Sequence, residues 1–234
     1  MRVLGVIPAR GGSKGIVKKN IVDICGKPLI AYTIDAASRS EKLSTFIVST
    51  DSDEIADVAT RCGGIAPFRR PAEISNDIAS SFDVVMHALD FMETESKDRY
   101  DAVMLLQPTT PMLTAATIDA AILQLSNCDC DSVVSVVDVG ANHPFRMYQL
   151  DDKNTLVGML ANDDPMMPRQ ELPKVYIRSG DIYLTRRECL IRKSSLIGTS
   201  SKAIVVEPED TVNIDTVEDL IIARHRIAQR TNLC

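Results

Sequence analysis

Arginine, lysine and glycine residues are concentrated in one short segment near the start of the chain. Residues 9–15 read Ala-Arg-Gly-Gly-Ser-Lys-Gly, and Lys19-Asn20 follows closely. Glycines let backbone N–H groups turn toward an anion, and Arg10, Lys14 and Lys19 add the charge that a polyphosphate needs. The segment therefore predicts a loop that binds a polyphosphate. The alternative is a flexible surface turn whose charges are only solvated.

The glycine spacing matches neither of two common phosphate-binding motifs. The chain lacks Gly-x-x-x-x-Gly-Lys-Ser/Thr, since Gly26-Lys27 is followed by Pro28. The pattern Gly-x-Gly-x-x-Gly fails as well, because Ser13 stands where the second glycine is needed. Any nucleotide bound here is held by a loop of a different kind.

Apolar periodicity places this loop directly after a buried strand. Strand-like runs cover residues 3–7, 46–48, 101–106 and 132–137, with helical patterns between them. Such alternation predicts an α/β fold in which helices cover a mostly parallel sheet. Ligands of these sheets bind beyond the carboxyl ends of the strands. The loops to search are those after Ile7, Thr50, Leu106 and Val137.

Helix-start signals support the same element order. The expected caps are Asp51 with Glu54, Ser80-Ser81, Thr114, and a capping box of Thr216 and Asp219. The alternation stops over residues 140–176 and resumes with a strand at 181–185, a short helix near 186–192 and a strand at 203–206. Long irregular stretches are uncommon inside a domain and are usually functional or interfacial. We expect one domain, residues 1–234, with an inserted dimerisation segment at about 140–176.

Composition and charge narrow the function classes. The 234 residues are 45% hydrophobic and 25% charged, which excludes intrinsic disorder. The net charge is −6, yet residues 1–20 contain five Lys or Arg and no Asp or Glu. The acidity of the whole chain excludes a broad nucleic-acid-binding surface, because nucleic-acid-binding domains are basic as a whole. The one basic loop can still bind a single small anion. No apolar run approaches a membrane span, and the first run is too short for a signal peptide.

The six cysteines form no metal-binding or redox motif. Only Cys128 and Cys130 are close, at Cys-x-Cys spacing. We expect reduced, partly buried cysteines in a cytoplasmic protein with no nucleic-acid or membrane partner. His87, His143 and His225 lie near no nucleophile and acid pattern, so a Ser-His-Asp hydrolase is not expected.

The first loop resembles the signature of the acylneuraminate cytidylyltransferases, the CMP-sialic acid synthetases. Five further stretches agree with that family in order, at residues 49–51, 70–73, 106–109, 168–170 and 214–216. The resemblance implies a Rossmann-like nucleotidyltransferase three-layer sandwich and a homodimer. It also implies that CTP and a nine-carbon 2-keto sugar acid react, with Mg²⁺ or Mn²⁺, to give CMP-sugar and pyrophosphate. Such products serve cell-surface polysaccharide biosynthesis.

The resemblance also assigns roles to individual residues. The implied nucleotide-binding residues are Ala9, Arg10, Gly12, Ser13, Lys14, Asn20, Arg70 and Ser81. The implied catalytic residues are Arg10, Lys14, Lys19 and Asp215, and the implied metal ligands are Asp215 and Asn213. The implied sugar-binding residues are Gln107, Arg169, Ser179 and Tyr183.

The chain departs from the family pattern in two places. Asn213 stands where an aspartate is frequent, and its amide oxygen brings no negative charge for a second metal. Ser179 stands where asparagine is usual, and Asp181 adds a carboxylate nearby. This second departure bears on which sugar acid fits.

Structural roles compete with these assignments. Asp215 could cap the last helix, Gln107 could end a strand, Arg169 could contact a second copy, Tyr183 could be core, and Arg70 could form a solvated pair with Arg69. At the level of function, the alternatives are CTP-dependent activation of another sugar acid such as Kdo and a non-catalytic nucleotide-binding subunit.

Overall fold

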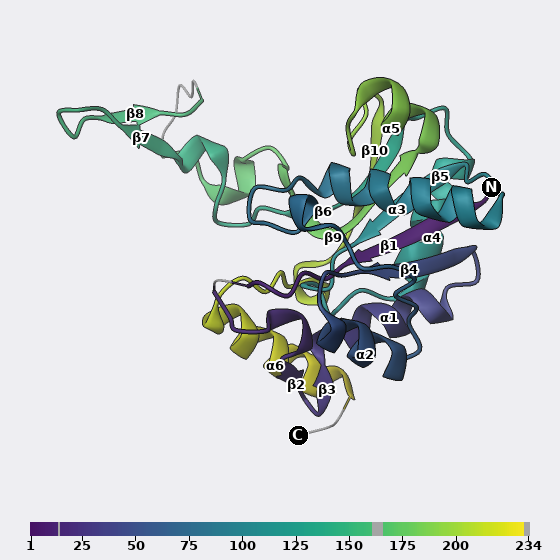
Figure 1. The fold of residues 1–234 in the computed structure, drawn as a ribbon. Helices are drawn as coiled ribbons and strands as arrows, with labels where there is room; N and C mark the ends of the chain where they lie inside the picture. The colour runs from purple at the N-terminus through teal and green to yellow at the C-terminus, as the bar shows by residue number, and fades with distance from the viewer. Residues whose placement is uncertain (14, 161–165, 232–234) are drawn as a thin grey trace.

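A six-stranded sheet forms the centre of the computed structural model, which describes residues 1–13, 15–160 and 166–231 (Figure 1). Its strands are β1 (Val3–Pro8), β4 (Thr45–Ser49), β5 (Ala102–Leu106), β6 (Ser132–Asp138), β9 (Tyr176–Arg186) and β10 (Ser201–Val205). The spatial order is β10-β6-β9-β5-β1-β4, and only β9 runs antiparallel to its neighbours β5 and β6. The predicted, mostly parallel sheet is confirmed.

Helices cover both faces of this sheet. They are α1 (Leu29–Arg39), α2 (Asp53–Arg61), α3 (Ser81–Ser96), α4 (Ala115–Ser126) and α5 (Arg187–Lys193), while α6 (Val217–Thr231) packs beside the sheet in a separate cluster. Because side chains alternate along a strand, Val3 and Ile7 of β1 pack in one buried cluster with α1, α2 and α4. Leu4 and Val6 pack in another with α3 and α5. The result is the expected three-layer sandwich. No helix in the described parts of the chain is long and apolar enough to cross a membrane.

A third cluster fixes α6 beside the first loop. Ile24 of the small hairpin β2 (Asp23–Ile24) and β3 (Lys27–Pro28) is buried with Leu29, Ile214 and Leu220. The segment before α6 is thus packed against the loop that follows β1, although about 200 residues separate them in sequence.

Short 3-10 helices occur at η1 (Lys19–Ile21), η2 (Ala72–Ile74), η3 (Pro144–Arg146), η4 (Arg169–Glu171) and η5 (Pro208–Asp210).

The predicted helix caps are confirmed except at α2. Ser80 caps α3, Thr114 caps α4, and Thr216 and Asp219 form the reciprocal capping box of α6. The cap of α2 is Ser52, whose Oγ accepts a hydrogen bond from the backbone N–H of Ile55 at 3.4 Å. Asp51 was the wrong residue, because its carboxylate accepts from the backbone N–H of Gly11 at 2.8 Å instead.

The inserted segment contains a hairpin that projects from the body of the molecule (Figure 1). Strands β7 (Tyr148–Leu150) and β8 (Leu156–Gly158) pair antiparallel. Both strands are exposed along their whole length, and the side chains of Leu150 and Leu156 are each 64% exposed. We call residues 139–175 the arm.

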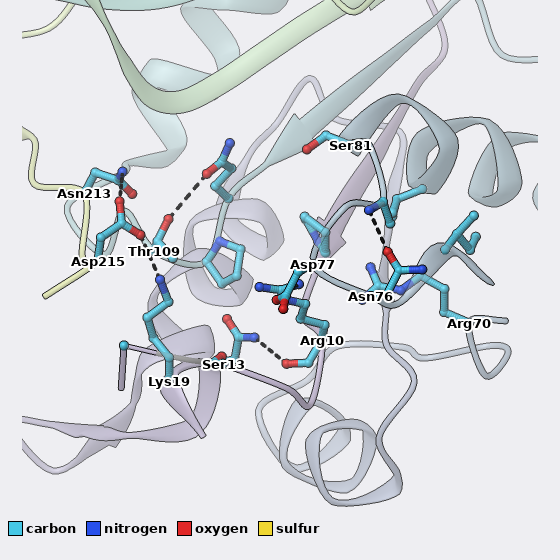
Figure 2. Close-up of a pocket in the computed structure, with 18 residues that line it drawn as sticks. Arg10, Ser13, Lys19, Arg70, Asn76, Asp77, Ser81, Thr109, Asn213 and Asp215 are labelled. Atoms are coloured by element: carbon cyan, nitrogen blue, oxygen red, sulfur yellow. Dashed lines mark hydrogen bonds and ion pairs between the residues drawn. The ribbon is translucent and has the colours of Figure 1, made fainter. Parts of the chain in front are cut away.

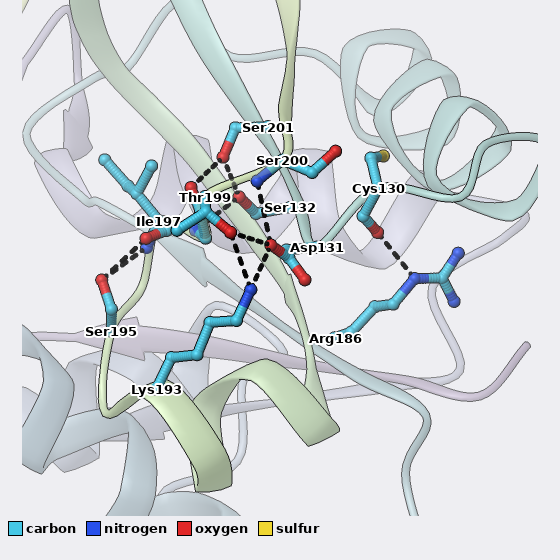
Figure 3. Close-up of polar contacts among 11 residues, drawn as sticks. Cys130, Asp131, Ser132, Arg186, Lys193, Ser195, Ile197, Thr199, Ser200 and Ser201 are labelled. Carbon is cyan, nitrogen blue, oxygen red and sulfur yellow. Dashed lines mark hydrogen bonds and ion pairs between the residues drawn. The ribbon is translucent and has the colours of Figure 1, made fainter.

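Asp131 ties the edge of the sheet to the loop between α5 and β10 (Figure 3). Its carboxylate accepts from Lys193 Nζ at 2.8 Å and from the backbone N–H of Ser200 at 2.9 Å. The hydrogen bonds from Lys193 and Ser200 lower the pKa of Asp131 to about 2. Arg186 closes the same corner by donating to the carbonyl oxygen of Cys130 at 2.8 Å. These contacts are far from the first loop in sequence and hold β10 beside β6.

One cysteine pair corrects the expectation of reduced thiols. Cys128 and Cys130 form a disulfide in the turn between α4 and β6. Their Cα atoms are 5.4 Å apart, within the range that a disulfide spans, although one residue separates them. Cys62 and Cys189 are thiols, as expected.

Candidate active site

A cavity of about 500 Å³ opens where β1 and β5 end (Figure 2). The first loop lines it with Pro8, Arg10, Ser13, Gly15, Lys19 and Asn20. The segment that leads into α3 lines it with Arg70, Ile74, Asn76, Asp77, Ala79, Ser81 and Val84. The remaining wall is Gln107, Pro108, Thr109, Asn213 and Asp215. Two of the four loops chosen from the sequence, those after Ile7 and Leu106, therefore line the cavity. Those after Thr50 and Val137 contribute no described residue to it.

Backbone contacts fix the course of the first loop. Ala9 donates its N–H to the carbonyl oxygen of Ser49 at 2.9 Å and is fully buried. Gly11 is held by Asp51, and buried Asn20 donates its amide to the carbonyl oxygen of Arg10 at 3.0 Å. The Arg10 side chain consequently faces the cavity. Ala9 and Gly12 are not part of the cavity wall, and Lys14 lies outside the described residues.

Gly15 brings this loop against the segment that precedes α6. A Cβ atom at this position would lie 2.7 Å from the backbone oxygen of Asp215. Real Cβ atoms do not approach a backbone oxygen so closely, so only glycine permits this contact without a shift of the backbone. The basic loop and residues 213–215 therefore form one continuous wall.

Lys19 and Asp215 form an ion pair in that wall. Lys19 Nζ lies 2.9 Å from Asp215 Oδ1 and donates to the carbonyl oxygen of Ile214 at 2.9 Å. Asn213 donates its amide to Asp215 Oδ2, also at 2.9 Å. Thr216 and Asp219 cap α6, so the Asp215 side chain does not form the cap. The Asp215 side chain is 65% exposed at the cavity.

Arg10 and Arg70 provide the positive charge on the other side (Figure 2). Arg70 is only 5% exposed, and its Nε donates to Ser75 Oγ at 3.1 Å. Burial lowers the pKa of Arg70, Asp51 at 3.9 Å raises it, and Arg10 lowers it further. The proposed solvated pair is wrong, since Arg69 points away to Asp53 while Arg70 lines the cavity.

The amino end of α3 adds a partial positive charge. Ser80 caps the helix by accepting from the backbone N–H of Asp83, and Ser81, the first helical residue, lines the cavity, so the N-terminus of α3 lies at the cavity wall. Helix N-termini favour bound anions. Together with Arg10, Arg70 and Lys19, this end of α3 makes the cavity suited to a polyanionic ligand.

The residues assigned to sugar binding are not gathered in this cavity. Gln107 lines it, and its Oε1 accepts from Thr109 Oγ1 at 3.4 Å. Ser179 is buried and donates to Ser135 Oγ at 2.7 Å, and Tyr183 packs against the core under α3. Arg169 is exposed on the arm. The structure thus brings one of the four, Gln107, to the cavity that the first loop lines.

The segment before α3 contains residues that sequence reasoning missed. Asn76, Asp77 and Ala79 all line the cavity. The Asn76 side chain accepts from the backbone N–H groups of Ile78 at 3.0 Å and Ala79 at 2.9 Å, which fixes a tight turn. The polar run Ser75-Asn76-Asp77, which two residues separate from the helix cap Ser80, was the signal available in the sequence.

Asp215 and Asn213 offer a small donor set for a divalent cation. The described residues contain no group of three or more His, Cys, Asp or Glu placed to hold a metal. Mg²⁺ is often bound by one or two protein oxygens, with substrate phosphates and water as its other ligands. One exposed carboxylate and one amide oxygen fit this kind of binding, in which the nucleotide brings the cation's remaining ligands.

The chain is similar to proteins that use cytidine nucleotides. A family model described as cytidylyltransferase matches residues 4–220. A pseudaminic acid cytidylyltransferase of Campylobacter jejuni is 31% identical over 224 residues, 96% of this chain and 95% of that protein. A CMP-N,N'-diacetyllegionaminic acid synthase of Legionella pneumophila is 34% identical over 220 residues, 94% of this chain and 93% of that protein.

A solved structure is similar in fold. The structure of CMP:2-keto-3-deoxy-manno-octonic acid synthetase complexed with CTP matches with a TM-score of 0.71 and 21% identity. The match covers 98% of this chain and all of that chain, which confirms the nucleotidyltransferase fold that the resemblance implied. The matched residues include the basic loop, the α3 segment and residues 213–215 that line the cavity. The chain therefore belongs to the cytidylyltransferase family.

Proposed function

We propose that this protein activates a nine-carbon 2-keto sugar acid with CTP, giving a CMP-sugar and pyrophosphate. The observation that carries the proposal is the cavity itself. Arg10, Lys19, Arg70 and the amino end of α3 converge there at the carboxyl ends of β1 and β5. The similarity to relatives named for CMP transfer to pseudaminic and legionaminic acids supports the reaction type and the substrate class.

The chemical step is an in-line displacement at phosphorus. The anomeric hydroxyl oxygen of the sugar acid bonds to the α-phosphorus of CTP, loses its proton, and the bond to the bridging oxygen of the pyrophosphate breaks. Catalysis then consists mainly of holding the two substrates in line and neutralising the charge on the leaving group. Arg10 and Lys19 face the cavity and would supply that charge.

A divalent cation would assist by neutralising phosphate oxygens and orienting the leaving group. Mg²⁺ or Mn²⁺ would be held by the Asp215 carboxylate, with the Asn213 amide oxygen as a neutral neighbour. Lys19 would then shift its ion pair from Asp215 toward the phosphates. The single carboxylate in this wall supports one metal rather than two.

Arg70 is the proposed reader of the base. It is buried, and Ser75 holds its guanidinium at a fixed angle. A rigid set of N–H donors suits the carbonyl oxygen and the ring nitrogen N3 of cytosine, which both accept hydrogen bonds. In uracil, by contrast, the same ring nitrogen carries a hydrogen and donates. Gln107, on the neighbouring wall, is the described candidate for contact with the sugar acid.

A homodimer is part of this proposal. The arm presents exposed apolar side chains on both of its strands, including Tyr148, Leu150, Leu156 and Val157. Burying such a surface against the same surface of a second copy removes it from water, and self-complementary contacts are usual in dimers. Arg169 lies on the arm and would then be close to the interface.

The test is a screen for pyrophosphate release. Four nucleoside triphosphates are each combined with N-acetylneuraminate, legionaminate, pseudaminate and Kdo, with Mg²⁺ present. We expect release only with CTP and with at least one of the three nine-carbon acids. Preference for Kdo would change the substrate class, and tight CTP binding without release on any acid would indicate a non-catalytic nucleotide-binding subunit.

A further inference from the structure

Asp77 occupies the space in front of Arg10. Its Oδ1 lies 2.8 Å from Arg10 Nη1, and both side chains line the cavity. The side chains remain 34% and 39% exposed, so a solute can reach the pair. A carboxylate placed in this way makes the same charge-assisted hydrogen bond that a phosphate oxygen would make.

The turn that carries Asp77 is held independently of this ion pair. Asn76 accepts from two backbone N–H groups of the turn and donates to the carbonyl oxygen of Glu73 at 2.9 Å. Ser75 Oγ donates to the carbonyl oxygen of Pro71 at 2.8 Å and accepts from Arg70. Asp77 is therefore presented to Arg10 by a preformed turn, and breaking the ion pair leaves the turn intact.

Neighbouring charges make the pair responsive to an incoming anion. Arg10 and Arg70 are close enough that Arg10 lowers the pKa of Arg70, and Asp51 Oδ1 lies 3.9 Å from Arg70 Nη2. A polyphosphate that enters gains a contact with Arg10, whereas its negative charge repels Asp77. A ligand that reaches Arg10 must therefore replace this ion pair.

We propose that Asp77 is an exchange partner of Arg10: it leaves the guanidinium when a polyphosphate binds and pairs with it again when pyrophosphate departs. This inference rests on the proposed function for the identity of the polyphosphate. Asp77 is a positioning residue, since it keeps Arg10 directed into the cavity between turnovers. It also limits how tightly pyrophosphate is retained after the chemical step.

The exchange has a specific energetic signature. Breaking the Arg10–Asp77 ion pair requires the same free energy for every ligand that contacts Arg10. A ligand that does not reach Arg10 leaves the ion pair in place and needs none of this free energy. A partly exposed ion pair contributes only a small free energy. A polyphosphate that no longer has to break it should therefore bind only about fivefold more tightly. Cytidine, which has no phosphate, gains nothing. If Asp77 had a purely structural role, its replacement would weaken the binding of both the polyphosphate and cytidine.

Calorimetry with inorganic tripolyphosphate and with cytidine separates these cases. Asp77→Asn removes the charge and keeps the side-chain shape, and Asp77→Ser serves as a second variant. We expect both to bind tripolyphosphate about fivefold more tightly and cytidine as the unchanged protein does. With active substrates, the KM for CTP falls and inhibition by pyrophosphate becomes stronger.

Asp53→Asn is the matched control. Asp53 pairs with Arg69 at 2.6 Å outside the cavity, so its loss changes the net charge equally without touching Arg10. Unchanged, weaker or unmeasurable tripolyphosphate binding by the Asp77 variants would overturn the proposal, as would an equal gain in Asp53→Asn. If the protein releases no pyrophosphate from CTP, the proposed function fails, yet the tripolyphosphate comparison still decides the role of Asp77.

Discussion

At the scale of residues, the candidate site depends on charged groups that differ in what they touch, although they look alike in sequence. Lys18 and Lys19 are adjacent, but Lys18 pairs with exposed Glu54 while Lys19 is mostly buried against Asp215. Arg69 and Arg70 differ in the same way. Because local sequence cannot tell which neighbour turns inward, these pairs supply matched variants for testing the site.

Replacing Lys19 with alanine is expected to remove most of the turnover. The positive charge sits at the Asp215 wall, where the leaving group would develop its charge, and loss of one such contact lowers kcat by about 100-fold or more. Lys18→Ala should retain turnover because Lys18 does not line the cavity. Steady-state kinetics with CTP compares the two. An equal loss of kcat in Lys19→Ala and Lys18→Ala would show that Lys19 has no catalytic role beyond its general positive charge.

Asp181 leads to a prediction about pH. It is 2% exposed and accepts from Thr211 Oγ1 at 3.0 Å. Burial raises the pKa of Asp181, so its contribution to stability is full below the unfolded-state pKa and is lost as pH rises through the higher folded-state pKa. Asp181→Asn cannot titrate. Its stability relative to the unchanged protein should therefore increase from pH 4 to pH 8, by roughly 1.4 kcal/mol per unit of pKa shift.

Urea unfolding at several pH values measures this difference. The comparison is between the two proteins at each pH, so effects of pH on all other groups cancel. A difference that stays flat, or that decreases with pH, would contradict a buried Asp181 with a raised pKa.

At the scale of elements, periodicity predicted the sheet strands and helices that surround the site, because each buries a regular apolar stripe. Contacts between distant segments were not predictable. Asp51 fits a helix cap locally, but Gly11, 40 residues away, takes its carboxylate. The arm's hairpin was missed because exposed β7 and β8 have no buried face to produce a pattern.

The same limit applies to the site. Arg10, Lys19, Asn20, Arg70, Ser81, Gln107 and Asp215 were predicted from motifs and do line one cavity. Ser179 and Tyr183 were predicted as well, but Ser179 is buried and Tyr183 is partly buried against the core, and neither lines this cavity. Asp77 was missed because its role depends on a turn that places it opposite Arg10.

Gly15→Ala tests the contact between the first loop and residues 213–215. The added methyl group would be 2.7 Å from a backbone oxygen, so the backbone must shift. We expect the free energy of unfolding to fall by about 1–3 kcal/mol, with a loss of turnover. Gly12→Ala is the stability control, since nothing lies within 4 Å of its Cβ position. Chemical denaturation compares them. Equal stability of both variants would contradict the close packing.

At the scale of the whole molecule, the cavity and the exposed arm lie on different parts of the chain. The hairpin of β7 and β8 projects from the body (Figure 1). The cavity is lined by residues of the body, whereas the side chains of Leu150 and Leu156 are exposed on the hairpin. An exposed apolar patch of this kind is a common mark of an interaction surface.

The double variant Leu150→Glu, Leu156→Glu tests the proposed dimer. These residues pair across the hairpin, and charges there oppose burial against a second copy. We expect the unchanged protein to sediment as a dimer at micromolar concentration and the variant as a monomer. The matched control is Ile221→Glu, at an exposed position on α6 away from the arm. A monomeric unchanged protein would refute the role of the arm.

The central claim is that the cavity transfers CMP from CTP to a sugar acid. It is tested most directly with CTP labelled at the α-phosphorus, incubated with Mg²⁺ and a mixture of nine-carbon 2-keto sugar acids. We expect the label to appear in a CMP-sugar, with one pyrophosphate released per labelled product and none without the acid. Label that stays in CTP, or that is released as free CMP whether or not the acid is present, would contradict it.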